Sequence, residues 1–376
     1  MGRLVAVVAE GTPSFVERLR RVWDAGDAVL PLDPRLPPPA AEIMLRAMRP
    51  AAVIGPDGDE VRLDGAEAVA DGDALVVATS GTTGAPRGAV LTHDAVVTSA
   101  VATSARLGVD PDRDRWLACL PLAHVGGLSV VTRALVTGTP LEVAPRPDPV
   151  VLAGAAARGA TLVSLVATAL ARVDTSAYRA VLLGGGAPPA ATTSNVVTTY
   201  GMTETGSGVV YDGVPLDGVE VRVVGGEVHV RGPMLLRAYR DGTDPRDADG
   251  WLATGDSGAL GSDGRLHVDG RLGDVIVTGG EKVWPDPVEA VLRAHRGVAD
   301  VAVVGRDDPE WGQRVVAHVV PTDPADPPTL DALRQAVKAR LPAWSAPREL
   351  VLEADLPRTA LGKVRRRQVG GRAQPA

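Results

Sequence analysis

The sequence predicts an α/β protein with a large amino-terminal domain of several subdomains and a small α+β carboxy-terminal domain. Short apolar runs alternate with stretches of helical periodicity over the first half of the chain, as they do where parallel sheets are flanked by helices. From about Val219 the runs shorten and turn residues separate them, which indicates a β-rich part. A length of 376 residues also exceeds what a single compact core usually holds.

The first half contains helices and a series of buried strands. Residues 14–25 place apolar side chains at helical spacing behind Ser14, which predicts an amphipathic helix. A second helix follows residues 121–128 and ends near Val136. Compact apolar runs, which suit strands buried on both faces, occur at residues 28–32, 51–54, 74–78, 161–165 and 180–183.

The second half predicts shorter strands and then a separate domain. Strands are expected at residues 219–224, 227–231 and 266–268, ahead of a polar, glycine-bearing break at residues 270–274. We place the domain boundary there, between domains of residues 1–271 and 272–376. The second domain is expected to contain strands at 275–278 and 301–305, helices at 286–295 and 330–340, and a disordered tail after Gly370.

Composition and charge narrow the class of protein. A formal charge of −7 gives no reason to expect nucleic acid or an anionic membrane as a partner. No apolar run approaches the ~20 residues that a membrane-spanning helix needs, and the start of the chain becomes acidic too soon for a signal peptide. Cys119 is the only cysteine, so no intrachain disulfide is possible. We expect a soluble cytoplasmic protein and leave open whether it forms a homodimer.

A segment rich in glycine and hydroxyl residues carries the first chemical signal. Residues 79–88 read Thr-Ser-Gly-Thr-Thr-Gly-Ala-Pro-Arg-Gly and follow a predicted buried strand. Backbone N–H groups and hydroxyls in such a loop can surround a polyphosphate, although the segment is not a Walker A loop. Taken alone, the segment has a flexible surface turn as its alternative interpretation. The candidate phosphate contacts are Thr79, Ser80, Gly81, Thr82, Thr83, Gly84 and Arg87.

The order of residues in this loop resembles the phosphate loop of the acyl-adenylate-forming (AMP-binding) enzymes, which include acyl-CoA synthetases, luciferases and peptide-synthetase adenylation domains. The resemblance continues, motif by motif, over nearly the whole chain. It implies a large nucleotide-binding domain and a small domain that rotates between two half-reactions. It also implies that ATP and Mg²⁺ serve to activate an organic acid, which then passes to the thiol of coenzyme A.

Two segments of the first domain resemble the family's nucleotide site. In Thr-Tyr-Gly-Met-Thr-Glu (199–204), the resemblance implies that Tyr200 stacks on adenine, Thr203 meets the α-phosphate and Glu204 ligates Mg²⁺. A single carboxylate suits this ion, which prefers oxygen ligands and keeps phosphates in its shell. Gly201 and Met202 complete the motif. Residues 183–189 resemble the adenine pocket, with Gly185, Gly186 and Ala187 as its contacts.

Later motifs resemble the ribose site, the thiol tunnel and the adenylation lysine. Asp256 matches the carboxylate that accepts hydrogen bonds from both ribose hydroxyls, and Arg271 a second ribose and phosphate contact. Gly279 and Gly280 match a loop that lines the tunnel for the thiol arm. Lys363 matches the lysine that offsets the charge of two approaching anions. Considered singly, the charged residues among these would be ordinary solvated side chains.

The acid is indicated by a narrower resemblance. Residues 163–166 and 199–218 resemble the o-succinylbenzoate–CoA ligases of menaquinone biosynthesis, whose substrate is a dicarboxylate. That implies a substrate pocket with His124, Ser164 and Arg133, in which Arg133 pairs with the carboxylate that does not react. A merely structural role is the alternative for His124. For Arg133 the alternative is a side chain that extends along an apolar helix to water.

Several positions depart from the family's pattern. Arg87 stands where lysine is common, which replaces a compact ammonium by a planar fork. Gly273 occupies the usual hinge position, Ala167 replaces a proline, and residues 190–195 are too few for the usual helix. Two alternatives therefore stay open: another acyl- or aryl-CoA ligase or carrier-protein-loading enzyme, and a non-catalytic adenylate-binding protein. Retention of Glu204, Asp256 and Lys363 together argues against the last.

Overall fold

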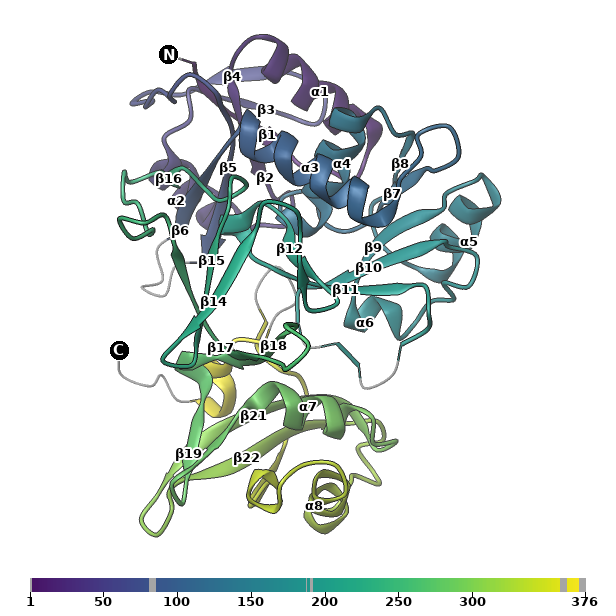
Figure 1. Cartoon of the computed structure of the whole chain (residues 1–376), viewed down its shortest axis with the longest axis vertical. Helices are drawn as coiled ribbons and strands as arrows, with labels where there is room; N and C mark the ends of the chain where they lie inside the picture. The colour runs from purple at the N-terminus through teal and green to yellow at the C-terminus, as the bar shows by residue number, and fades with distance from the viewer. Residues whose placement is uncertain (1, 81–85, 187, 190–191, 359–363, 372–376) are drawn as a thin grey trace. The chain divides into compact units, whose positions relative to one another are not determined.

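The chain forms two compact units in the computed structural model, which describes residues 2–80, 86–186, 188–189, 192–358 and 364–371 (Figure 1). Unit 1 contains residues 1–185, 193–221 and 229–253, and unit 2 contains residues 186–192, 222–228 and 254–376. The last change from unit 1 to unit 2 falls at Thr254, ahead of the boundary predicted at Arg271. The division into domains of residues 1–271 and 272–376 stays a prediction.

The first sheet of unit 1 has the strand order β16-β6-β5-β2-β1-β3-β4. Neighbouring strands among β1, β2, β3 and β5 are parallel, whereas β4, β6 and β16 join antiparallel. The strands are β1 (Leu4–Val8), β2 (Ala28–Leu32), β3 (Ala52–Ile54), β4 (Glu60–Arg62), β5 (Asp73–Ser80), β6 (Pro86–Thr92) and β16 (Ala238–Tyr239). The apolar runs predicted as strands in this region are confirmed as β2, β3 and β5.

The second sheet of unit 1 has the order β13-β12-β11-β10-β9-β7-β8. Strands β8, β7, β9, β10 and β11 are parallel, and β12 and β13 complete the sheet as antiparallel strands. Their bounds are β7 (Trp116–Ala118), β8 (Leu141–Val143), β9 (Leu162–Val166), β10 (Ala180–Gly184), β11 (Val196–Gly201), β12 (Gly208–Tyr211) and β13 (Val214–Pro215). The predicted strands at 161–165 and 180–183 are β9 and β10.

Helices connect the parallel strands and cover the sheets. The helices of this unit are α1 (Pro13–Asp24), α2 (Pro38–Met48), α3 (His93–Leu107), α4 (Val125–Thr137), α5 (Pro149–Ala157) and α6 (Ala167–Leu170). Helices α3 and α4 pack side by side (Figure 1), and α3 contacts β5 and β6 of the first sheet while α4 contacts β7 and β9 of the second. This helix pair therefore lies between the two sheets of the unit.

Helix α1 shows how the sequence pattern becomes structure. Its buried residues include Phe15, Leu19 and Val22, which recur every three or four positions and so share one face. The expected Ser14 cap is wrong: the N-cap is Thr12, and Pro13 takes the first helical position. Proline suits that place because its missing N–H would have no partner within the helix.

The β-rich part is a four-stranded sheet of order β14-β15-β17-β18. It contains β14 (Glu220–Val224), β15 (Glu227–Arg231), β17 (Leu252–Leu260) and β18 (Leu266–Arg271). The strands expected at 219–224, 227–231 and 266–268 are confirmed here. The predicted break at 270–274 begins one residue before the end of β18 and continues as a 3₁₀ turn, η2 (Leu272–Asp274).

The carboxy-terminal part of unit 2 is an α+β fold with its own apolar core. The sheet order is β20-β19-β22-β21, and β23 pairs parallel with β22. Its elements are β19 (Ile276–Thr278), β20 (Glu281–Val283), α7 (Pro285–Arg293), β21 (Val298–Asp308), β22 (Gly312–Pro321), α8 (Leu330–Lys338), η3 (Ala343–Ser345), β23 (Glu349–Leu352) and η4 (Arg366–Gly371). Buried Leu292 of α7, Leu333 of α8 and Val303 of β21 belong to one core.

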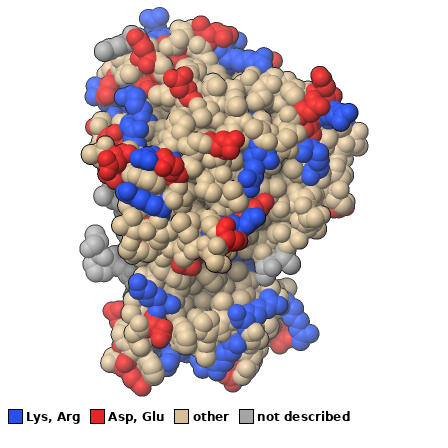
Figure 2. Space-filling model, in the orientation of Figure 1, with Lys and Arg blue, Asp and Glu red and all other residues tan. Residues whose placement is uncertain are grey.

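The face of the molecule in Figure 2 shows no single dominant sign of charge. Acidic and basic side chains are interspersed on the face shown in Figure 2, in keeping with the net charge of −7. No helix in the described parts of the chain is long and apolar enough to cross a membrane.

A buried ionic cluster ties the end of the chain to α7. The Arg366 guanidinium lies 2.8 Å from Asp274 and 3.0 Å from Glu289, and also pairs with Asp286. The side chains of Arg366 and Glu289 are only 13% and 6% exposed. Burial raises the pKa of Glu289 despite the opposing effect of Arg366. The cluster therefore depends on its cation, which offsets three acidic groups.

Loss of that cation should destabilise unit 2. We expect Arg366→Ala to lower the free energy of unfolding by about 3 kcal/mol, because it leaves a buried carboxylate without its partner. Urea unfolding of the full chain measures the change. Arg365→Ala is the matched control, since the neighbouring side chain is exposed and its loss should change stability by less than about 0.5 kcal/mol. Equal effects of the two substitutions would contradict this account.

Candidate active site

The predicted site segments follow the carboxyl ends of parallel strands. In the second sheet of unit 1, His124 comes after β7, Gly185 after β10 and Glu204 after β11. In the first sheet, Asp33 follows β2, and the predicted phosphate loop begins at the end of β5, which is parallel to β2. Parallel strands end at a common edge of their sheet, where open α/β proteins bind ligands. The topology therefore gathers segments that are far apart in the sequence.

A tight turn presents the predicted nucleotide motif. Strand β11 ends at Gly201, and the 3₁₀ turn η1 (Thr203–Thr205) follows. The Thr205 hydroxyl accepts a hydrogen bond from the Met202 N–H at 2.9 Å and lies 2.6 Å from the carbonyl oxygen of Ser207. A Cβ atom at Gly201 would lie 2.1 Å from that same oxygen. Only glycine therefore fits at this position of the turn.

Glu204 is held from two directions. Its backbone carbonyl accepts a hydrogen bond from Leu236 N–H at 2.7 Å, and Oε1 of its carboxylate accepts one from the Tyr239 hydroxyl at 2.8 Å. Oε2 has no hydrogen-bond partner among the residues that the structure describes. One positioned carboxylate with an available oxygen fits a Mg²⁺ ion that takes its other ligands from phosphates and water.

His124 lies beside an aspartate that the sequence reasoning missed. Its Nε2 is 3.4 Å from Oδ2 of Asp33, longer than an ordinary hydrogen bond. Arg35 donates to the same carboxylate at 2.9 and 2.6 Å. Burial alone would raise the pKa of Asp33, but the contacts with Arg35 and His124 prevail and hold it well below its usual range. The available signal was an acidic residue directly after a buried parallel strand.

Arg133 points into unit 1 and does not reach water. The residue is 2% exposed, its Nη2 donates to the Ser207 hydroxyl at 3.1 Å, and its guanidinium carbon lies 4.9 Å from the ring centroid of Trp116. Nε and Nη1 have no hydrogen-bond partner among the described residues. Burial lowers the pKa of Arg133. Of the two alternatives for this residue, the solvated one is therefore wrong.

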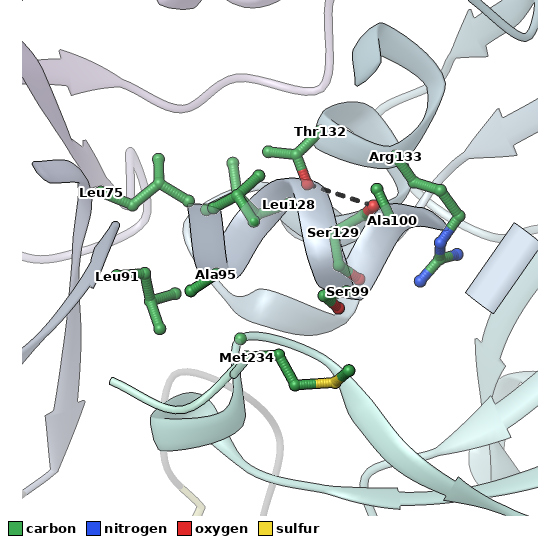
Figure 3. A pocket seen from close by; sticks show the side chains of 12 residues that line it. Leu75, Leu91, Ala95, Ser99, Ala100, Leu128, Ser129, Thr132, Arg133 and Met234 are labelled. Carbon is green, nitrogen blue, oxygen red and sulfur yellow. Dashed lines mark hydrogen bonds between the residues drawn. The ribbon is translucent and has the colours of Figure 1, made fainter. Parts of the chain in front are cut away.

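A small cavity adjoins Arg133. Figure 3 shows aliphatic side chains, including Leu75 and Leu91, at one end of this pocket and Arg133 at the other, with hydroxyl side chains such as Ser129 between them. The cavity holds about 10 Å³, roughly the room for one water molecule. An organic acid could enter it only after the lining side chains from α3 and α4 separate.

Two further predicted contacts meet in unit 2. Asp256 of β17 and Arg271 of β18 are cross-strand partners, with Arg271 Nε 2.8 Å from Asp256 Oδ1. Arg271 also donates to the carbonyl oxygen of Thr254 at 2.8 Å. The carboxylate and guanidinium predicted to bind ribose are thus adjacent.

The backbone conformation explains why two glycines stand together in the segment predicted to line the thiol tunnel. Gly279 and Gly280 connect β19 to β20 as a two-residue hairpin with φ values of 58° and 84°. Positive φ at both positions of such a turn favours glycine. A role for these residues in binding the thiol arm stays a prediction.

Other predicted residues lie beside or outside the described parts of the chain. Gly81, Thr82, Thr83, Gly84, Ala187 and Lys363 are outside them. Thr79 pairs with Arg87 across β5 and β6 at the base of the phosphate loop, and Arg358 forms a bridge with Val364 on the two sides of the lysine segment. Ser164 is buried in β9. No helix occurs among the described residues between β10 and β11, where the sequence is short.

Comparison with known proteins decides the family. Residues 56–240 match the AMP-binding enzyme family and residues 287–363 match the AMP-binding enzyme C-terminal domain. A probable 2-succinylbenzoate–CoA ligase of Mycobacterium tuberculosis is 43% identical over 357 residues, which cover 87% of this chain and 92% of that protein. The chain belongs to the AMP-binding enzyme family. The predicted family is thereby confirmed.

A further relative and a solved structure also resemble this chain. The 2-succinylbenzoate–CoA ligase of Bacillus cytotoxicus is 35% identical, over 78% of this chain and 69% of that one. The structure of O-succinylbenzoate coenzyme A synthetase (MenE) from Bacillus subtilis, in complex with AMP, has a TM-score of 0.86 and 26% identity, covering 98% of this chain and 88% of that one. The predicted α/β fold, with a large amino-terminal and a small carboxy-terminal domain, is confirmed by this match.

Proposed function

We propose that this chain is an ATP-dependent acid–CoA ligase with 2-succinylbenzoate as its acid, acting in menaquinone biosynthesis. Relatives that carry the name 2-succinylbenzoate–CoA ligase support the activity. The observation that carries the choice of acid is the buried guanidinium of Arg133, two of whose nitrogens lack a partner among the described residues. A monocarboxylic acid offers nothing to this group once its only carboxylate has reacted.

The state of Arg133 is costly without a ligand. A buried polar group that lacks hydrogen bonds costs about 1–3 kcal/mol, and a charged one costs more. A second carboxylate would restore charge balance and can accept two parallel hydrogen bonds from a guanidinium. The benzoate carboxylate of 2-succinylbenzoate is such a group, because the succinyl carboxylate is the one activated. In this proposal Ser164, in β9, and His124 complete the substrate pocket.

Each of the other predicted residues has a role in one of the two half-reactions of this proposal. First, a carboxylate oxygen of the acid attacks the α-phosphorus of ATP, forming acyl-AMP and releasing pyrophosphate. Second, the sulfur of coenzyme A attacks the acyl carbon, forming the thioester and releasing AMP. Bound at Glu204, Mg²⁺ would supply positive charge to the polyphosphate. Lys363 would neutralise the approach of two anions, and Thr203 would contact the α-phosphate.

The nucleotide and the thiol have separate contacts in this proposal. The adenine would stack on Tyr200, near the glycine-rich segment that follows β10. The ribose would bind the paired Asp256 and Arg271, and the thiol arm would pass Gly279 and Gly280. Cytoplasmic location and a homodimer remain predictions from the sequence.

The activity is tested with purified protein and a panel of acids. We expect pyrophosphate release with ATP, Mg²⁺ and 2-succinylbenzoate, and formation of the CoA thioester when coenzyme A is added. Preference for another acid would refute the substrate alone. Pyrophosphate release without thioester formation would favour an enzyme that loads a carrier protein, and no release with any acid would favour a non-catalytic adenylate-binding protein.

Replacement of Arg133 should separate function from stability. Arg133→Met removes the charge but keeps much of the side-chain volume, so we expect kcat/KM for 2-succinylbenzoate to fall about 100-fold, the value of a lost buried charge–charge pair. Stability should stay equal or rise, because a buried, incompletely paired cation is removed. Steady-state kinetics and thermal unfolding measure the two effects. Unchanged kcat/KM would remove Arg133 from the substrate pocket.

Replacement of Lys363 should affect one half-reaction. We expect Lys363→Ala to reduce pyrophosphate release at least 100-fold, because no cation then offsets the colliding anions. Thioester formation from supplied acyl-adenylate should stay within about twofold, because the proposed role of Lys363, at the meeting of the carboxylate with the α-phosphate, belongs to the first step only. Single-turnover assays of each step provide the measurement. An equal loss in both steps would contradict a role in adenylation.

A further inference from the structure

Tyr239 connects two parts of the candidate nucleotide site. It lies in β16, which pairs with β6 through Tyr239 and Ala89. The Tyr239 N–H donates to the carbonyl oxygen of Thr243 at 2.8 Å, and the next residue, Arg240, donates its N–H to Gly88 at 2.7 Å. The backbone on both sides of this residue is therefore held, and the ring has a defined position at the edge of the first sheet.

Both the hydroxyl and the ring face of Tyr239 make contacts. Its hydroxyl donates to Oε1 of Glu204 at 2.8 Å. The face of its ring carries the guanidinium of Arg87, whose central carbon lies 3.8 Å from the ring centroid. Arg87 in turn pairs with Asp241 at 3.3 Å. A continuous path of contacts thus runs from Asp241 through Arg87 and Tyr239 to Glu204.

We infer that Tyr239 is a positioning residue for the metal-binding carboxylate of Glu204, and that Arg87 acts on this carboxylate through the Tyr239 ring. The inference rests on the proposed function, in which Glu204 binds the Mg²⁺ of Mg·ATP. A hydrogen bond to one carboxylate oxygen restricts rotation of the group and would leave the other oxygen available to the ion. Partners of this kind commonly change metal affinity or activity 10- to 100-fold when they are removed.

The same contacts give a physical reason for arginine at position 87. A guanidinium is planar and stacks on an aromatic face, whereas an ammonium is a compact, strongly hydrated charge. Arg87 can therefore hold the Tyr239 ring and keep a positive charge at the start of β6, within the predicted phosphate loop. A tyrosine hydroxyl is protonated at neutral pH and a carboxylate is an acceptor only, so Tyr239 is the donor in its hydrogen bond to Glu204.

The test measures ATP binding by calorimetry, once with Mg²⁺ and once with EDTA in its place. The quantity compared is the dissociation constant of ATP in EDTA divided by the dissociation constant of ATP with Mg²⁺. This ratio reports the contribution of the metal alone. We expect Tyr239→Phe to lower this ratio at least 10-fold and to leave ATP affinity in EDTA within about twofold. An unchanged ratio, or an equal loss of ATP affinity with and without Mg²⁺, would overturn the inference.

Two further variants separate positioning from general effects. Tyr178→Phe is the matched control, because the hydroxyl of the buried Tyr178 likewise donates to an acceptor oxygen, the Leu152 carbonyl at 2.9 Å. It should leave the ratio unchanged. Arg87→Lys should lower the ratio in the wild-type chain but not in the Tyr239→Phe background; an equal effect in both would show that Arg87 does not act through Tyr239. Absence of ATP binding by the wild-type chain would instead refute the proposed function.

Discussion

The organisation of unit 1 depends on strand β6 being hydrogen-bonded along both edges. On one side it pairs with β5, and on the other with β16, which is far away in the sequence. The first pairing closes the predicted phosphate loop at its base. The second brings Tyr239 alongside, and the neighbouring Leu236 N–H holds the backbone of Glu204. The strands that flank the predicted phosphate loop and the backbone of Glu204, the proposed metal ligand, thus share one framework of backbone hydrogen bonds.

Two buried arginines differ in how their charge is compensated within the fold. Arg366 is surrounded by three acidic groups, so its burial is compensated within the fold. Arg133 is buried with one hydrogen bond and a contact with Trp116, and its remaining nitrogens have no partner among the described residues. Such a difference is informative because uncompensated burial lowers stability. A group kept in that state fits a ligand that restores the balance.

Much of the candidate site was predictable because the motifs are local. The order of residues in 79–88 and 199–204 predicts a nucleotide site without knowledge of the fold, and the match over residues 56–240 confirms the family that this order indicated. Asp33 and Tyr239 were not found, because each gains its meaning from a partner on another element: His124 for the first and Glu204 for the second. The sequence also left open whether the Arg133 side chain extends to water or into the interior. An apolar helix surface can face either water or a core, and the partners that decide this lie on other elements.

The sequence by itself determined which segments become strands and helices, because apolar runs and helical spacing are local properties that burial must satisfy. It also determined the family, through short motifs that follow one another along this chain. Only the tertiary structure decided that Arg133 turns inward, that Arg87 stacks on Tyr239, and that Asp256 meets Arg271. These contacts arise from strand pairing and helix packing between distant segments, which no local pattern in the sequence specifies.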